Sequence, residues 1–132
     1  MRVHHLAIAC ADIMQSRDLW SKLLNMAPPD IHILENRGVK ACVFNTSNLR
    51  IELVEPLGEN SPIAKFVKER GGGLHHLALE TWDIENEMNR GISNGLNFIG
   101  DKPLEGLGNT RVIFIHPKSI GVLVELVEPP KE

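Results

Sequence analysis

The 132-residue sequence predicts an α+β fold in which a βαβββ module occurs twice. Two pairs of matching segments lead to this prediction. Residues 3–13 read VHHLAIACADI and residues 74–84 read LHHLALETWDI, with six of eleven positions identical. Residues 50–56 (RIELVEP) match residues 123–129 (LVELVEP) at five of seven positions. Because the pairs are offset by 71 and 73 residues and keep their order, they indicate a duplicated module of about 60 residues.

The first module contains the expected elements in order. Residues 3–10 are apolar and typical of a strand. Asp12, followed three residues later by Gln15, forms the capping-box pattern of a helix that runs to about Leu24. Turn residues then separate three further strands, which are expected near residues 31–35, 39–45 and 49–54.

The second module repeats this pattern. A strand over residues 74–80 precedes Asp83, which is expected to cap a helix whose apolar side carries Ile84, Met88 and Ile92 at four-residue spacing. Three strands should follow, near residues 97–100, 111–116 and 122–127. Pro and Gly interrupt residues 101–110, which are therefore expected to form a mobile loop.

A short helix is expected between the modules. Ser61 and Pro62 are typical of an N-cap and a first helical position, and the three glycines that follow Arg70 should end the helix. The sequence thus predicts one domain over residues 1–132. Within it, module one covers about 1–56, the linker helix about 57–72 and module two about 73–129.

Composition excludes several classes of protein. The chain has 14 Lys and Arg against 17 Asp and Glu and no basic run, which argues against a nucleic-acid or membrane partner. No apolar stretch approaches the ~20 residues of a transmembrane helix, and the N-terminus does not resemble a signal peptide. Cys10 and Cys42 are expected to be reduced core residues of a cytoplasmic protein, with a disulfide as the alternative.

Four polar residues occupy equivalent places in the two modules. Alternation along the first repeated strand places His5 on the same face as small alanines, and His76 holds the same place in the second copy. Glu52 and Glu125 lie between aliphatic residues in the other repeated strand. There an unneutralised carboxylate would be costly.

These four residues predict a site for one divalent metal ion, with His5, Glu52, His76 and Glu125 as ligands. Imidazole and carboxylate ligands suit Co, Ni, Zn, Mn or Fe(II), and two carboxylates balance a 2+ charge. The alternative is that each His ends a strand against the core and each Glu forms a surface salt bridge. That alternative does not explain why both copies keep the same residue types.

The repeated strands, with their His and their mid-position Glu, resemble the vicinal oxygen chelate superfamily, which includes glyoxalases, bleomycin resistance proteins and dioxygenases. In that superfamily two βαβββ modules form a cup-shaped mixed sheet around a metal. Within it, residues 52–80 and 110–129 are similar to the methylmalonyl-CoA epimerase family. The segments Ser61-Pro62-Ile63 and His116-Pro117-Lys118 are the more specific part of this resemblance.

The resemblance implies an enzyme that interconverts (R)- and (S)-methylmalonyl-CoA by moving the proton on C2. It carries over one divalent ion (Co, Ni, Zn or Mn), an acyl-CoA substrate and a homodimer. Glu125 would transfer the proton on one face as well as bind the metal. The family places the second acid/base Glu two residues before a Gly. In this sequence that position, two residues before Gly38, is Asn36, and Glu35 lies one residue before Asn36. We expect Glu35 to take this role, with Asn36 as the alternative.

Three other functions share the fold. Glyoxalase I acts on the methylglyoxal–glutathione hemithioacetal with the same ligand set, and only the two more specific segments favour the epimerase over it. An Fe(II) ring-cleaving oxygenase would use two His and one carboxylate, which leaves Glu52 surplus. A non-catalytic binder of a small molecule would lack the metal ligands, so all four residues argue against it.

Overall fold

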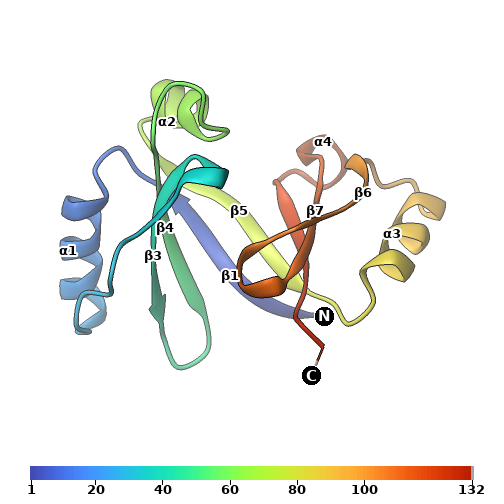
Figure 1. The fold of residues 1–132 in the computed structure, drawn as a ribbon, viewed down its shortest axis with the longest axis horizontal. Helices are drawn as coiled ribbons and strands as arrows, with labels where there is room; N and C mark the ends of the chain where they lie inside the picture. The colour runs from blue at the N-terminus through green and yellow to red at the C-terminus, as the bar shows by residue number, and fades with distance from the viewer. Residues whose placement is uncertain (132) are drawn as a thin grey trace. The chain divides into compact units, whose positions relative to one another are not determined.

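A computed structural model describes residues 1–131 of the chain. The elements follow the order βαβββ twice (Figure 1). The first copy comprises β1 (Arg2–Ala9), α1 (Ile13–Leu24), β2 (His32–Leu34), β3 (Val39–Asn45) and β4 (Arg50–Pro56). The second comprises β5 (Gly73–Glu80), α3 (Ile84–Ser93), β6 (Phe98–Glu105), β7 (Arg111–Ile115) and β8 (Val124–Glu128). Helix α2 (Ala64–Arg70) lies between the copies in sequence, and α4 (Pro117–Ile120) joins β7 to β8.

Both copies pair their strands in the same way. β2 with β3 and β3 with β4 are antiparallel, whereas β4 with β1 is parallel. β6 with β7 and β7 with β8 are antiparallel, and β8 with β5 is parallel. The register also repeats, because Ala7 lies opposite Glu52 and Ala78 lies opposite Glu125. The predicted α+β fold with a duplicated βαβββ unit and mixed strands is therefore confirmed.

The contacts divide the chain into two compact units. One is Leu6–His75, and the other combines Met1–His5 with the chain from His76 onward. The first five residues thus belong to the unit that contains the second copy. The single domain and its module bounds near residues 56 and 73 stay predictions. Among residues 1–131, no helix has the length and apolar character needed to cross a bilayer.

In the unit Leu6–His75, α1 covers β3 and β4 (Figure 1). Its buried core contains both cysteines, which are free. The two cysteines flank β4, which lies between β1 and β3: Cys10, directly after β1, donates its N–H to Val54 O at 2.9 Å, and Cys42 of β3 lies opposite Leu53. Two strand spacings of about 4.8 Å keep the Cα atoms beyond the ~7 Å limit of a disulfide. The cysteines are thus reduced core residues, as predicted.

In the other unit, α3 packs against β6 and β8 (Figure 1). The predicted apolar side of α3 is buried at Ile84 and Met88, which are 0% and 5% exposed, but Ile92 in the last turn is 58% exposed, so the prediction was wrong there. Burial of such side chains is the main favourable term in folding. The remaining fully buried members of this core are Ile113, Ile115, Val124 and Leu126.

The predicted helix caps are confirmed at both modules. The Asp12 carboxylate accepts from the Gln15 N–H at 3.2 Å and begins α1. Asp83 accepts from the Asn86 N–H at 3.1 Å and begins α3. Each bond satisfies one of the amides that a helix N-terminus leaves without an intrahelical partner.

The second glutamate of each repeated strand, Glu55 or Glu128, accepts a hydrogen bond from the first residue of a helix. The Ile13 N–H donates to Glu55 Oε1 at 2.9 Å, and the Ile84 N–H donates to Glu128 Oε2 at 2.8 Å. A cation accompanies each carboxylate, with Lys40 Nζ 3.6 Å from Glu55. Arg111 Nη1 is 3.3 Å from Glu128. The Glu of the repeated VEP sequence therefore forms a structural hydrogen bond between a strand and the helix of the same copy.

Two element bounds predicted from sequence were wrong. Residues 101–105 are not a loop, because β6 continues to Glu105 and pairs again with β7 after a register shift between Ile99 and Leu104. A bulge lets the strand resume pairing beyond its irregular stretch. Helix α2 begins at Ala64 with Ile63 as N-cap, so Ser61 does not cap it and forms part of the preceding turn.

Candidate metal centre

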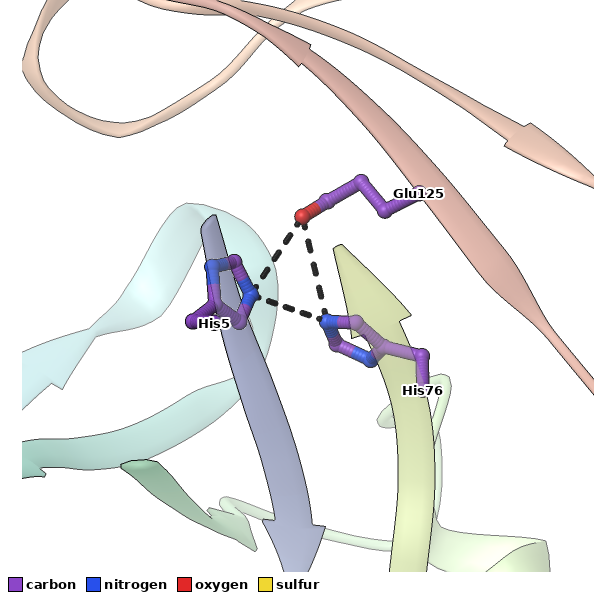
Figure 2. A group of neighbouring side chains, drawn as sticks. All are labelled: His5, His76 and Glu125. Atoms are coloured by element: carbon purple, nitrogen blue, oxygen red, sulfur yellow. Dashed lines mark hydrogen bonds and ion pairs between the residues drawn. The ribbon is translucent and has the colours of Figure 1, made fainter. Parts of the chain in front are cut away.

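Three of the four predicted ligands lie together in the unit that combines Met1–His5 with the chain from His76 onward. The Nε2 atoms of His5 and His76 are 3.2 Å apart. Glu125 Oε1 is 3.4 Å from His5 Nε2 and 3.8 Å from His76 Nε2. Figure 2 shows these side chains pointing toward one another from β1, β5 and β8. All three are buried, with exposed fractions of 8%, 7% and 2%.

The residues around this group support its arrangement. Ala78 of β5 and Phe114 of β7 lie on either side of Glu125 in the strand register. The alanine adds only a methyl group beside the carboxylate. The Phe114 ring packs edge-on against His76, with ring centroids 5.5 Å apart and planes at 90°. The strand register thus places the carboxylate between Ala78 and Phe114, and the Phe114 ring also packs against the His76 imidazole.

The three donor atoms fit a metal ion. Ligands about 2.0–2.2 Å from one ion, at octahedral or tetrahedral angles, lie about 2.8–3.6 Å from each other. The observed separations of 3.2, 3.4 and 3.8 Å fall in or near this range. Imidazole nitrogen and carboxylate oxygen are ligands that first-row divalent metals accept. His5, His76 and Glu125 could therefore hold one such ion.

Among the described residues, a second group of carboxylates also has oxygen atoms within 4.8 Å of one another, close enough to share a metal ion: Asp83, Glu85 and Glu128. Here the guanidinium of Arg111 already bonds both Glu85 and Glu128, at 3.1 and 3.3 Å. Asp83 caps α3. Glu85 and Glu128 thus form an ion-pair network with Arg111, and each of the three carboxylates already has a structural partner.

Glu52 lies on β4, in the unit Leu6–His75. It is flanked in the register by Ala7 and Val43 and is partly buried. Burial raises the pKa of its carboxyl above the ordinary value, and the charge of Arg37 partly offsets this. A carboxylate in such a place needs a positive partner, but its role as fourth ligand stays a prediction.

Glu35 and Asn36 are both exposed, in a 3₁₀ turn that ends at Gly38 with φ of 69°. The turn borders an open cleft of about 580 Å³. A side chain at Gly38 would contact Ser61 and Pro62 at 3.4 and 3.5 Å. Two residues of the more specific segments therefore pack against the turn that carries both candidate acid/base residues.

His116, in the other specific segment, caps a helix. Its Nδ1 accepts from the Lys118 N–H at 3.1 Å at the start of α4, and Pro117 occupies the first turn. Proline suits this place because its missing N–H would have no partner there. The His-Pro-Lys sequence thus encodes a tight turn between β7 and β8.

Comparison with known proteins assigns the family. The sequence profile described as Glyoxalase/Bleomycin resistance protein/Dioxygenase superfamily matches residues 4–114. The chain belongs to this superfamily. Within the superfamily, it is 34% identical over 129 residues to the mitochondrial methylmalonyl-CoA epimerase of Dictyostelium discoideum, covering 96% of this chain and 78% of that one. It is 37% identical over 131 residues to the ethylmalonyl-CoA/methylmalonyl-CoA epimerase of Cereibacter sphaeroides, covering 95% and 96%.

Solved structures of superfamily members agree. Methylmalonyl-CoA epimerase from Mycobacterium tuberculosis matches with a TM-score of 0.88 and 34% identity, covering 98% of this chain and 89% of that one. The Streptomyces coelicolor epimerase in complex with 2-nitronate-propionyl-CoA matches with a TM-score of 0.87 and 28% identity, covering 99% of each. The resemblance to epimerases of this superfamily, predicted from sequence, is confirmed.

Sequence reasoning missed one neighbour of the metal centre. Alternation along β1 places His4 and His5 on opposite faces, yet their Nδ1 atoms are 2.8 Å apart. The only sequence feature that could have indicated this contact is the doubled histidine itself.

Proposed function

We propose that this protein is a metal-dependent epimerase that interconverts (R)- and (S)-methylmalonyl-CoA. The buried group of His5, His76 and Glu125 carries the proposal, because it occurs in a chain 34–37% identical to named epimerases over nearly its whole length. Solved neighbours are described with methylmalonyl-CoA and with 2-nitronate-propionyl-CoA bound, which supports an acyl-CoA substrate.

The reaction requires removal of the proton on C2 and its return on the opposite face. A divalent ion held by His5, His76 and Glu125 would supply the positive charge that stabilises the enolate form of the thioester. The two imidazoles are neutral donors, so the carboxylate of Glu125 balances part of the ion's charge. A carboxylate has two oxygens, and we assign Glu125 the proton transfer on one face as well as a ligand bond.

We assign the transfer on the other face to Glu35. Crystal structures of the Streptomyces coelicolor epimerase carry substitutions of a glutamate and of a glutamine that lie 17 positions apart in that chain. Glu35 and Glu52 have the same spacing of 17 in this sequence, whereas Asn36 and Glu52 do not. An amide cannot serve as a proton acceptor at C2, which also favours Glu35 over Asn36.

The finer parts of the proposal rest on sequence. Glu52 would be the fourth ligand, because it holds the place in its module that Glu125 holds in the other. The ion would be Co, Ni, Zn or Mn, which accept these ligand types. We also propose a homodimer in the cytoplasm. In support of association, β6 ends the strand order of its copy and exposes Ile99 and Leu104.

The test compares Glu125→Gln with Glu105→Gln, a matched change at an exposed position of β6. Metal content is measured by elemental analysis, and epimerisation is followed from one stereoisomer of methylmalonyl-CoA. Removing a ligand that also transfers the proton should lower the rate by at least about 10²–10⁴-fold, the usual contribution of general acid–base catalysis. Glu105→Gln should keep both properties. Wild-type protein that holds stoichiometric metal but does not epimerise the substrate would contradict the proposal.

A further inference from the structure

His4 contacts the metal centre from outside the ligand group. Its Nδ1 lies 2.8 Å from Nδ1 of His5, and the two rings meet edge-on with centroids 5.1 Å apart and planes at 72°. His4 is partly buried, and both residues belong to the same compact unit. Two ring nitrogens at this distance share one proton, so one donates and the other accepts.

The direction of this hydrogen bond decides what His5 can do. If Nδ1 of His5 donates to His4, the neutral His5 ring keeps a lone pair on Nε2, the atom 3.4 Å from Glu125 Oε1. If His4 donates instead, the neutral His5 ring carries its proton on Nε2. That proton would point at Glu125 Oε1 or at Nε2 of His76, 3.2 Å away. Only the first arrangement leaves Nε2 of His5 able to bind a metal ion.

We propose that His4 is a positioning residue that accepts the Nδ1–H of His5 and so holds His5 in its metal-binding tautomer. The inference rests on the proposed metal site. Ligand histidines commonly donate their second nitrogen to an acceptor of this kind, which fixes the tautomer and the ring orientation. The required property of His4 is therefore an acceptor atom at the place of Nδ1, and any side chain that supplies one should suffice.

The doubled histidine recurs in the second copy. There the corresponding residue is His75, whose ring packs edge-on against Phe66 at 5.1 Å. The doubled histidine thus has different surroundings in the two modules. Conservation of the His-His pair between the copies does not by itself give His75 the role of His4.

The test uses three variants of the full chain. His4→Leu removes the acceptor, His4→Asn keeps an acceptor oxygen near the place of Nδ1, and His32→Leu changes an exposed histidine of β2 as a control. Affinity for Zn²⁺ is measured by competition with a chelator. Nitrogen-15 NMR of the imidazoles reports which nitrogen of His5 carries the proton, before and after Zn²⁺ is added.

We expect His4→Leu to weaken Zn²⁺ binding about 10- to 100-fold, the usual effect of losing such a partner. His4→Asn should restore most of the affinity, and His32→Leu should bind like wild type. In metal-free wild type, His5 should carry its proton on Nδ1, and in His4→Leu this tautomer should lose population.

Unchanged affinity in His4→Leu, or a proton on Nε2 of His5 in metal-free wild type, would overturn the role of His4. So would equal loss in the Leu and Asn variants, since the acceptor atom would then not matter. Absence of Zn²⁺ binding in wild type would overturn the proposed metal site instead. In that case the tautomer of the metal-free protein still tests the contact with His4.

Discussion

Glu125 and Glu128 lie three residues apart on β8, and both are almost fully buried, at 2% and 4% exposed. Their partners differ in kind. Glu125 faces two imidazoles, whereas Glu128 accepts a backbone N–H and pairs with Arg111. A buried carboxylate is costly unless it is paired. One short repeated sequence therefore contains a carboxylate for the candidate site and a carboxylate for the fold.

At the residue scale the clearest pH prediction concerns Cys42. Burial raises the pKa of this thiol to about 11. At pH 8 only about 10⁻³ of it would be thiolate, against roughly a quarter for an ordinary cysteine with pKa 8.5. Because the thiolate is the reactive form, we expect a Cys10→Ser variant to be alkylated slowly by iodoacetamide at pH 8. Reaction should accelerate as the pH rises toward 11.

The same variant in urea provides the control, since unfolding exposes Cys42 and returns its pKa to the ordinary range. Mass spectrometry after timed quenching measures the rate in both conditions. Equal rates in native buffer and in urea at pH 8 would contradict the burial that the structure gives this residue.

At the scale of elements, a strand glutamate in each βαβββ copy accepts a hydrogen bond from the first residue of that copy's helix. Glu55 and Glu128 accept the first amides of α1 and α3, which the aspartate caps leave without a partner. The contact fixes where each helix begins relative to the sheet strands of its own copy. The repeated VEP sequence is explained by this contact and does not require catalysis.

This account predicts the effect of Glu128→Ala. The change leaves the buried Ile84 N–H without its acceptor and should lower the free energy of unfolding by about 1–3 kcal/mol. Urea unfolding followed by circular dichroism measures it. Glu85→Ala is the matched control, because it removes an exposed partner of the same Arg111 and should have a smaller effect. A larger loss for Glu85→Ala than for Glu128→Ala would contradict the assignment.

Most helices and strands were predicted well from local signals, whereas two element ends that depend on more distant contacts were not. Asp12 and Asp83 mark helix starts that depend on a few neighbouring residues, so sequence suffices. The extension of β6 to Glu105 depends on renewed pairing with β7, and no local pattern reveals a partner strand. Likewise α2 begins at Ala64 because the preceding turn takes up Ser61, which its capping preference did not indicate.

At the scale of the whole molecule, duplication made the candidate site predictable. His5, His76 and Glu125 could be selected because each occurs at an equivalent place in two copies, and because alternation places the histidines beside small alanines and the glutamate between aliphatic residues. The contact between His4 and His5 could not be predicted, because it runs against the alternation of a strand. The sequence pattern also could not decide between Glu35 and Asn36. Strand alternation does not apply to them, because a 3₁₀ turn replaces the expected end of the strand.

Metal binding should also stabilise the whole chain. An ion that binds only the folded state adds about 2.7 kcal/mol to the free energy of unfolding when its concentration is 100 times Kd. We therefore expect Zn²⁺ to raise the Tm of wild-type protein, and EDTA to reverse the effect. In His76→Ala the shift should be lost. The same shift in wild type and His76→Ala would show that the ion binds elsewhere.

The most direct measurement is exchange of the C2 proton in D₂O. Metal-loaded protein is incubated with one stereoisomer of methylmalonyl-CoA, and NMR follows deuterium at C2 and the configuration of the product, with Glu35→Ala in parallel. The account predicts rapid metal-dependent exchange with inversion, and loss of inversion in the variant. Absence of exchange with metal fully bound would contradict the epimerase, and turnover of the methylglyoxal–glutathione hemithioacetal instead would identify a glyoxalase.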